Sequence, residues 1–339
     1  MMRGPQHETP QLPRRGRRIT RPLHRIALLL LTLLPFLAAG SQTGCRRPTK
    51  PSTMRFAVLP ILDALPVYVA AEEGYFAEEG LDVELIPAAS AAERDQLLQA
   101  DQVDGVITDL VALALYNRER TQVVAVRYAM VPTREFPQFR ILGAAGSGRQ
   151  KPSDLRNVPV GVSEGTVIEY VTDRLLMAEG LDPDDIAALA VPKIPERMAL
   201  LNSGELQAAT LPEPLATLAM EQGARVVADD SQHPELSASI FAFTADLLEK
   251  DPEAVTAFVR AVDGASAAIN ADKTRWATLL AERNLIPPSL SGTYTLPDYP
   301  AGGVPSPDQL ADVGAWLIQE GRLEVEPIYD EVVDTSYAE

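Results

Sequence analysis

The spacing of apolar and polar positions changes repeatedly along the first half of the chain. MRFAVL, at 54–59, is nearly continuous in apolar character and is typical of a buried strand. LDVELI, at 81–86, alternates and is typical of a half-buried strand. Strands and helices that alternate with short links predict a parallel sheet with right-handed crossovers. The full pattern predicts strands over 54–59, 81–86 and 103–108, and helices over 67–80, ended by Gly80, and 91–101.

The same order of elements recurs about one hundred residues further on. EGLD at 79–82 reappears at 179–182, between matching apolar patterns. A repeated unit of this kind predicts an α/β fold with two lobes, each an open, mostly parallel sheet flanked by helices. The second copy predicts strands over 158–162, 186–191 and 205–211, and helices over 166–180 and 195–204.

A basic and then apolar segment precedes the first strand. Residues 14–25 are rich in arginine, and the apolar run 26–40 is interrupted by Pro35 before it could span a membrane. We predict an export signal over 1–44, by either the general or the twin-arginine route, and a tether over 45–53. Gly44 before Cys45 resembles the lipidation site of bacterial lipoproteins. Cleavage after 38–40, or an uncleaved anchor, is the alternative and leaves Cys45 a free thiol.

Charge and composition exclude several kinds of function. Seven of the 30 basic residues but one of the 47 acidic residues precede Cys45, so the rest of the chain has a net charge near −23. Such a surface repels phosphate backbones, which argues against nucleic-acid binding. After Cys45 the chain has one histidine, His233, so we predict no metal site, no cofactor and no Cys/His catalysis.

Three segments resemble one family of transport proteins. GYFAEEGLDVELIP (74–87), LLQADQVDGVITD (97–109) and LPEPLATLAMEQGARVV (211–227) are similar to solute-binding proteins of ABC importers for nitrate, taurine, alkanesulfonates and thiamine precursors. The resemblance implies a periplasmic-binding fold with two crossover strands, near 139–142 and 240–243. It also implies a monomer outside the cytoplasm that passes a small molecule to a permease and its ATPase. Lobe 1 is then expected over 54–140 and 243–339, and lobe 2 over 141–242.

Candidate ligand contacts follow from the ends of the predicted strands, because open sheets bind ligands there and facing lobes form a cleft that closes by hinge motion. Serine, threonine and aspartate at such places are also ordinary helix caps, a role that competes most directly at Ser90 and Ser163. The aromatic candidates compete with core packing. The polar candidates are Asp63, Ser90, Thr108, Asp109, Ser163, Glu164, Gly165, Thr166 and Glu213, and the aromatic ones are Tyr68, Phe139 and Tyr170.

The candidates are rich in carboxylates and hydroxyls and poor in arginine. A nitrogen heterocycle, such as a thiamine-precursor-like pyrimidine, would donate N–H bonds to them and stack on aromatic rings. An anion of the sulfonate or nitrate type is the second interpretation, because helix N-termini bind anions without arginine. The alternative function is an enzyme of the same fold that acts on a pyrimidine or a menaquinone precursor.

Overall fold

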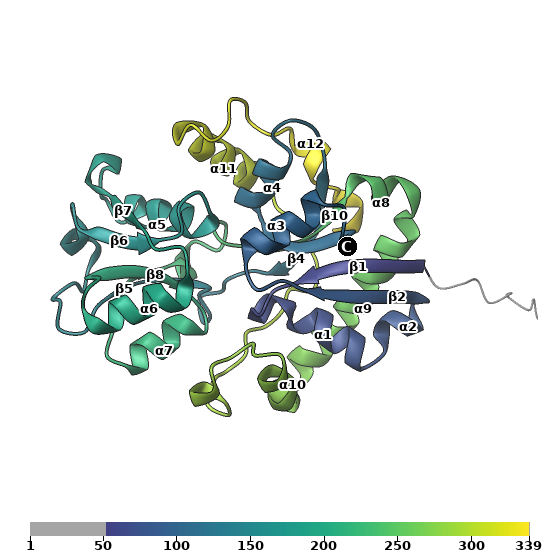
Figure 1. The fold of residues 1–339 in the computed structure, drawn as a ribbon, viewed down its shortest axis with the longest axis horizontal. Coiled ribbons are helices and arrows are strands. Elements are labelled where there is room, and N and C mark those ends of the chain that lie inside the picture. The colour runs from purple at the N-terminus through teal and green to yellow at the C-terminus, as the bar shows by residue number, and fades with distance from the viewer. Residues whose placement is uncertain (1–51, 339) are drawn as a thin grey trace, which may run out of the picture. The chain divides into compact units, whose positions relative to one another are not determined.

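Two five-stranded sheets form the framework of the protein (Figure 1). The computed structural model describes residues 52–338. The predicted export signal, Cys45 and the tether up to residue 51 lie outside the described residues.

The first sheet, sheet A, has the strand order β2-β1-β3-β10-β4. β1 pairs in parallel with β2 and β3, whereas β10 runs antiparallel to β3 and β4. Four strands therefore point the same way and one returns between them. The strands are β1 (Ser52–Val58), β2 (Leu81–Pro87), β3 (Gly105–Asp109), β4 (Val123–Met130) and β10 (Ser239–Thr244).

The second sheet, sheet B, repeats this plan with the order β7-β6-β8-β5-β9. β5 is its antiparallel strand, placed between β8 and β9 as β10 is placed between β3 and β4. The repeat of the elements and the two-lobed α/β fold are thus confirmed. The strands are β5 (Phe139–Gly143), β6 (Pro159–Val162), β7 (Ala187–Ala190), β8 (Ala208–Pro212) and β9 (Arg225–Asp229).

Helices cover both sheets in the order that the sequence predicts, with one break. The predicted helix 67–80 is two helices, because Gly74 takes a left-handed conformation with φ 84° between them. No helix within residues 52–338 has both the length and the apolar character that crossing a bilayer requires. The helices are α1 (Leu65–Glu72), α2 (Tyr75–Glu78), α3 (Ala91–Gln99), α4 (Leu110–Tyr116), α5 (Val167–Ala178), α6 (Ile194–Ser203), α7 (Leu215–Glu221), α8 (Ala245–Lys250), α9 (Pro252–Ala271), α10 (Ala277–Glu282), α11 (Pro307–Gln319) and α12 (Tyr329–Val332).

The two faces of sheet A belong to different hydrophobic cores. Phe56 and Ala57 are neighbours in β1 and are both buried, and they point into opposite cores because side chains alternate along a strand. On one face Phe258 of α9 stacks on Phe56, with ring centroids 4.6 Å apart. Aromatic pairs add about 0.5–1.5 kcal/mol beyond the area they bury, so this contact anchors α9 to sheet A. The segment after β10 therefore packs back onto sheet A through α9.

The core on the other face of sheet A continues into sheet B. It contains Val106 of sheet A, Val160 of sheet B and Trp316 of α11. In Figure 1, α11 lies beside α4 and near α5. The two sheets therefore share buried contacts as well as two chain connections, over 131–138 and 230–238.

Candidate functional site

A cavity of about 170 Å³ lies where the two sheets meet at the strand ends. Drug-sized ligands occupy about 300–1,000 Å³, so this cavity suits a smaller molecule. Its walls come from the carboxyl ends of β3 and β8, the loop after β1, the first turns of α3, α5 and α6, and both connections between the sheets. The lining residues are Ile61, Leu62, Asp63, Ala91, Arg94, Ile107, Thr108, Asp109, Met130, Phe136, Gln138, Phe139, Val167, Ile168, Ile194, Pro212, Glu213, Ser237 and Ser239.

The register of the sheets explains why both connections reach this cavity. Ser239, the first residue of β10, pairs with Asp109, the last residue of β3. Phe139, the first residue of β5, pairs in the same way with Pro212, the last residue of β8. Because β5 and β10 are antiparallel, their amino ends lie at the edge where the parallel strands end. The cavity is therefore lined both by the last residues of the parallel strands and by the first residues of the antiparallel strands.

Two carboxylates, Asp63 and Asp109, face the cavity without an ion-pair partner among residues 52–338. Burial raises the pKa of Asp63, and the negative charge of Asp109 raises it further, while the Ser239 hydroxyl and a backbone N–H partly oppose the shift. Burial also raises the pKa of Asp109, although nearby Arg94 opposes the shift. Like charges brought together in a buried place favour a shared proton or a bound cation.

Three buried side-chain oxygen atoms of the cavity wall make no hydrogen bond of normal distance and angle to another described residue. They are Oγ1 of Thr108, Oε1 of Gln138 and Oγ of Ser239. The three residues are 3%, 6% and 8% exposed. The Ser239 hydroxyl interacts with Asp63 and the Thr108 hydroxyl with Tyr116, so Oε1 of Gln138 is the oxygen left without any partner among the described residues. An unpaired buried polar group costs about 1–3 kcal/mol, and a ligand that donates to Gln138 would remove that cost.

The other two charged residues of the wall already have partners. The guanidinium of Arg94 makes an ion pair of 2.9 Å with Asp95 and donates to the carbonyl of Ile107. Glu213 accepts from Nε of Arg140 at 2.6 Å and from the hydroxyl of Thr217 at 2.7 Å. Neither side chain brings an uncompensated charge to the cavity.

The structure brings five of the predicted contact residues together in the cavity: Asp63, Thr108, Asp109, Phe139 and Glu213. Seven others are not part of its lining. Among these, Ser90 caps α3 by accepting from the backbone N–H of Glu93 at 3.2 Å. Thr166 caps α5 through the N–H of Ile168, also at 3.2 Å. Ala91 and Val167, the residues next to these caps, do line the cavity.

The rest of the SEGT loop is occupied by its own contacts. Ser163 accepts from Arg197 at 2.9 Å and donates to the carbonyl of Pro192. The N–H of Gly165 donates to Glu169 at 2.6 Å. Glu164 is exposed beside them. Ligand contact by Ser163, Glu164, Gly165 and Thr166 stays a prediction that would require the lobes to move.

The two tyrosine candidates pack elsewhere. Tyr68 is buried in the core beneath α1, where Arg283 lies over its ring at 5.1 Å. Tyr170 of α5 donates to Asp312 of α11 at 2.6 Å and meets the ring of Trp316 edge-on. Stacking of either ring on a ligand stays a prediction.

A buried carboxylate joins the two connections at the cavity. Asp230, 0% exposed, accepts from the backbone N–H groups of Gln138 at 2.9 Å and Phe139 at 3.1 Å, and from the hydroxyl of Ser237. Burial raises the pKa of Asp230 to about 7, although these donors partly oppose the shift. The two connections between the sheets are therefore held to each other by the Asp230 side chain.

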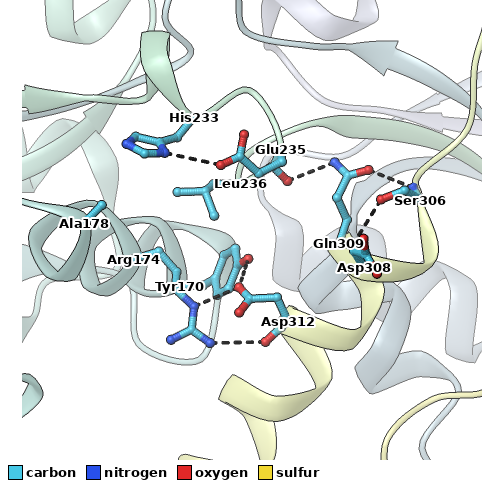
Figure 2. A pocket seen from close by; sticks show the side chains of 10 residues that line it. All are labelled: Tyr170, Arg174, Ala178, His233, Glu235, Leu236, Ser306, Asp308, Gln309 and Asp312. Atoms are coloured by element: carbon cyan, nitrogen blue, oxygen red, sulfur yellow. Dashed lines mark hydrogen bonds and ion pairs between the residues drawn. The ribbon is translucent and has the colours of Figure 1, made fainter.

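A larger and more open hollow of about 510 Å³ lies between α5, the second connection and α11 (Figure 2). Its walls are tied together by hydrogen bonds, from Arg174 to Asp312 and from Gln309 to the carbonyl of Glu235. It is lined by none of the strand ends and contains no unpartnered buried polar atom. The smaller cavity is therefore the better candidate for a ligand site, in spite of its size.

Neither cavity has the composition of a metal centre. Within residues 52–338, no three histidine, cysteine, aspartate or glutamate side chains lie close enough together to hold an ion. His233 lines the open hollow beside Glu235, with 3.2 Å between its Nδ1 and the carboxylate.

The profile of the NMT1-like family matches residues 47–282, more than two thirds of the sequence. The chain belongs to this family. No curated protein matches the chain.

Solved structures of the same fold are numerous, and three illustrate its range. The aliphatic sulphonate binding protein SsuA of Escherichia coli, a periplasmic protein, is 16% identical with a TM-score of 0.70, covering 83% of this chain and 91% of its own. The periplasmic nitrate-binding protein NrtA of Synechocystis PCC 6803 is 19% identical with a TM-score of 0.66, covering 84% and 87%. A DSZB mutant in complex with biphenyl-2-sulfinic acid is 16% identical with a TM-score of 0.62, covering 85% and 98%. At these identities the likeness shows the fold, which agrees with the resemblance found in the sequence.

In this NMT1-like chain, sequence reasoning missed the polar residues that precede the crossover strands. Gln138 and Ser239 stand at the amino ends of β5 and β10, whereas the polar candidates were taken from the carboxyl ends of the predicted strands. An antiparallel strand brings its first residue to the same edge. The polar residues just before each predicted crossover were therefore the signal that could have found them.

Proposed function

We propose that the protein is the solute-binding component of an ABC importer and encloses one small molecule between its lobes. The observation that carries the proposal is the cavity at the facing strand ends of the two sheets, with the buried oxygen atoms of Thr108, Gln138 and Ser239 in its wall. A ligand that touches both lobes stabilises the closed arrangement. The family and the neighbouring sulphonate- and nitrate-binding structures support this assignment.

The favoured ligand is a nitrogen heterocycle of the thiamine-precursor type. The cavity wall offers hydrogen-bond acceptors, which are the carboxylates of Asp63 and Asp109 and the side-chain oxygens of Thr108, Gln138 and Ser239. Phe136 and Phe139 add apolar ring surface. An anion of the sulfonate or nitrate type is the second choice, because such ligands are bound by the neighbouring proteins. An affinity near micromolar, about 8 kcal/mol, would allow both capture and release.

The setting that goes with this function is extracytoplasmic. Residues 1–44 act as the export signal, Cys45 carries the lipid anchor, and residues 45–53 tether a monomeric body to the membrane surface. Lobe 1 comprises 54–140 and 243–339, and lobe 2 comprises 141–242. A permease and its ATPase are the partners.

A thermal-shift screen of the purified protein against pyrimidines, sulfonates, nitrate, flavins and amino acids tests the proposal. A ligand that binds only the folded protein raises the midpoint by mass action. We expect a hit whose effect is lost in Asp109→Asn but retained in Asp82→Asn, an exposed aspartate of β2 with the same change of side chain. Absence of any hit, together with a gene neighbourhood that encodes no permease or ATPase, would refute it.

An enzyme of the same fold is the second candidate, acting on a pyrimidine or a menaquinone precursor. The raised pKa values of Asp63 and Asp109 in one cavity favour it, because acid–base catalysts are found in such surroundings. Conversion of a hit from the screen, followed by mass spectrometry, separates the two functions. An unchanged ligand recovered after long incubation supports transport.

A further inference from the structure

The cavity has a surplus of negative charge that its own residues do not neutralise. Arg94, the cationic side chain of the wall, is already paired with Asp95, and Glu213 of the wall is paired with Arg140. Asp63 and Asp109 remain, with no ion-pair partner among residues 52–338. Two buried carboxylates that influence each other cannot both ionise without cost.

The groups that face these carboxylates come from every element around them. Asp63 is faced by Asp109, by the Ser239 hydroxyl of β10 and by Tyr299, whose own hydroxyl donates to the carbonyl of Leu62 at 2.8 Å. Asp109 accepts from the N–H of Ala112 at 2.9 Å and is influenced by Arg94 and Asp95 of α3. Arg94 is thus the only positively charged side chain among these groups.

The uncharged part of the wall suits a planar ligand group that donates hydrogen bonds. The orphaned oxygen of Gln138 can only accept, and the hydroxyls of Thr108 and Ser239 can accept as well as donate. All three residues are more than nine-tenths buried and line the same cavity as the carboxylates. Phe136 and Phe139 add ring faces, which attract cations.

We propose that this cavity takes its ligand as a monocation with several N–H donors on a compact planar group, such as an amidinium, a guanidinium or a protonated aminoheterocycle. This inference rests on the proposed function and narrows its ligand class. In the empty protein the carboxylate pair holds a proton, which passes to the solvent when the cation enters. Under this inference sulfonates and nitrate bind more weakly than the cation, because they would add a negative charge beside Asp63 and Asp109.

Three probes of nearly equal shape test the charge rule: benzamidinium, benzamide and benzoate. Isothermal titration of the purified protein should find benzamidinium bound more tightly than benzamide by about tenfold or more, and benzoate bound least. Smaller cations, acetamidinium and methylguanidinium, extend the set in case the ring is too large. Affinity for the cation should fall as the pH is lowered, because protons then compete for the pair. Titration in two buffers of different ionisation heat should show proton release.

Variants separate recognition from folding. Asp63→Asn and Asp109→Asn should each abolish the preference for the cation, whereas Asp82→Asn should keep it. At pH 8 and without ligand, Asp63→Asn should also raise the thermal midpoint, because it removes like-charge repulsion from the cavity. A variant that fails to fold would lower the midpoint, so the two effects are distinguishable.

The binding results distinguish a failure of the cation inference from a failure of the proposed function. Preference for benzamide, benzoate or a sulfonate, lost in Asp109→Asn, would overturn the charge rule and leave solute binding intact. Failure of every cation in the set, while a neutral or anionic solute binds, would do the same. Failure of every solute in both this set and the broader screen would overturn both.

Discussion

Arg94 and Arg197 occupy equivalent places in the repeated unit and differ in their partners. Each is the fourth residue of the helix that follows the second strand of the repeated unit, which is α3 after β2 or α6 after β7. Arg94 is paired with Asp95. Arg197 is 0% exposed, with no carboxylate partner and no hydrogen bond from Nε or Nη2 among the described residues. Burial lowers the pKa of Arg197 to about 10.

The lack of an ion-pair partner for Arg197 predicts how its replacement changes the free energy of unfolding. Arg197→Met should leave the free energy of unfolding unchanged or raise it by about 1–4 kcal/mol, because the cost of burying the charge disappears. Arg94→Met should lower it, because Asp95 loses its partner. Urea denaturation of both variants measures the difference. A loss of more than about 2 kcal/mol in Arg197→Met, of the size expected for a broken buried pair, would contradict the argument.

Asp230 makes a prediction about pH. Its pKa is near 7 in the folded protein and near 3.8 in the unfolded chain, so the folded state binds the proton more strongly between these values. Its contribution to stability is therefore fully present below pH 3.8 and is lost as the pH rises to about 7. The stability of the wild type relative to Asp230→Asn should fall over this range and stay level above it.

Denaturation of the two proteins at several pH values checks the slope, with Asp184→Asn, an exposed aspartate, as control. A difference that stays flat from pH 4 to pH 7 would show that Asp230 is ionised throughout. Asp230→Asn should also be less stable in general, because one of its two N–H donors would face an amide NH₂ group.

At the scale of elements, helix α11 links the two lobes away from the cavity. It packs against α4 of lobe 1, and Trp316 donates to Asp173 of α5 at 2.9 Å. Trp316→Phe removes the donor together with part of the ring, so beyond its packing cost it should lose about 1–3 kcal/mol by leaving the half-buried Asp173 without this hydrogen bond. Trp276→Phe is the matched control, because it makes the same change in a buried ring whose Nε1 has no hydrogen-bond partner among the described residues, so it should cost the packing energy alone.

Thermal or urea unfolding compares the two tryptophan variants. Equal costs would mean that the Trp316 hydrogen bond contributes nothing beyond ring packing. Asp173 adds a second readout, because burial raises its pKa to about 6 and the indole N–H opposes that shift. Its pKa should rise further in Trp316→Phe.

The sequence predicted most elements because their signals are local. Apolar spacing placed β1, β2, β3, β6, β7 and β8 within a few residues, and the family resemblance placed the crossover strands β5 and β10. The strands β4 and β9 were not predicted. The break at Gly74 was missed, since EEGYFAEEG has helix-forming residues on both sides of the glycine. Side-chain direction was not predictable either, because Ser90 and Thr166 satisfy helix ends while Gln138 and Ser239 reach the cavity through pairing of distant strands.

At the scale of the whole molecule, the lobes are joined by the two connections, by α11 and by the loop that carries Tyr294. Tyr294 lies edge-on to Phe136 with centroids 5.9 Å apart, and its hydroxyl is 3.4 Å from Glu213 of lobe 2. Contacts between the lobes therefore flank the cavity. Relative motion of the lobes must break or repack these contacts, so their strength affects how readily the cavity opens.

A solute that bridges the lobes should slow amide exchange at both. Hydrogen exchange measured by mass spectrometry should detect protection over 131–138, over 230–238 and at the strand ends of sheets A and B together. Protection confined to one sheet would indicate binding to a single lobe and would argue against closure. Asp109→Asn, exposed to the same solute, should lack the effect and serves as control.

The interleaved position of β10 also bears on how the molecule is built during synthesis. All five strands of sheet B emerge from the ribosome in one stretch, 139–229, whereas sheet A waits for residues 239–244. Because β10 lies between β3 and β4, sheet A cannot make its full set of strand pairs before residues 239–244 are synthesised. The half of the protein whose synthesis begins first is thus the last to be completed, and α9, which covers one face of sheet A, follows β10 in the chain.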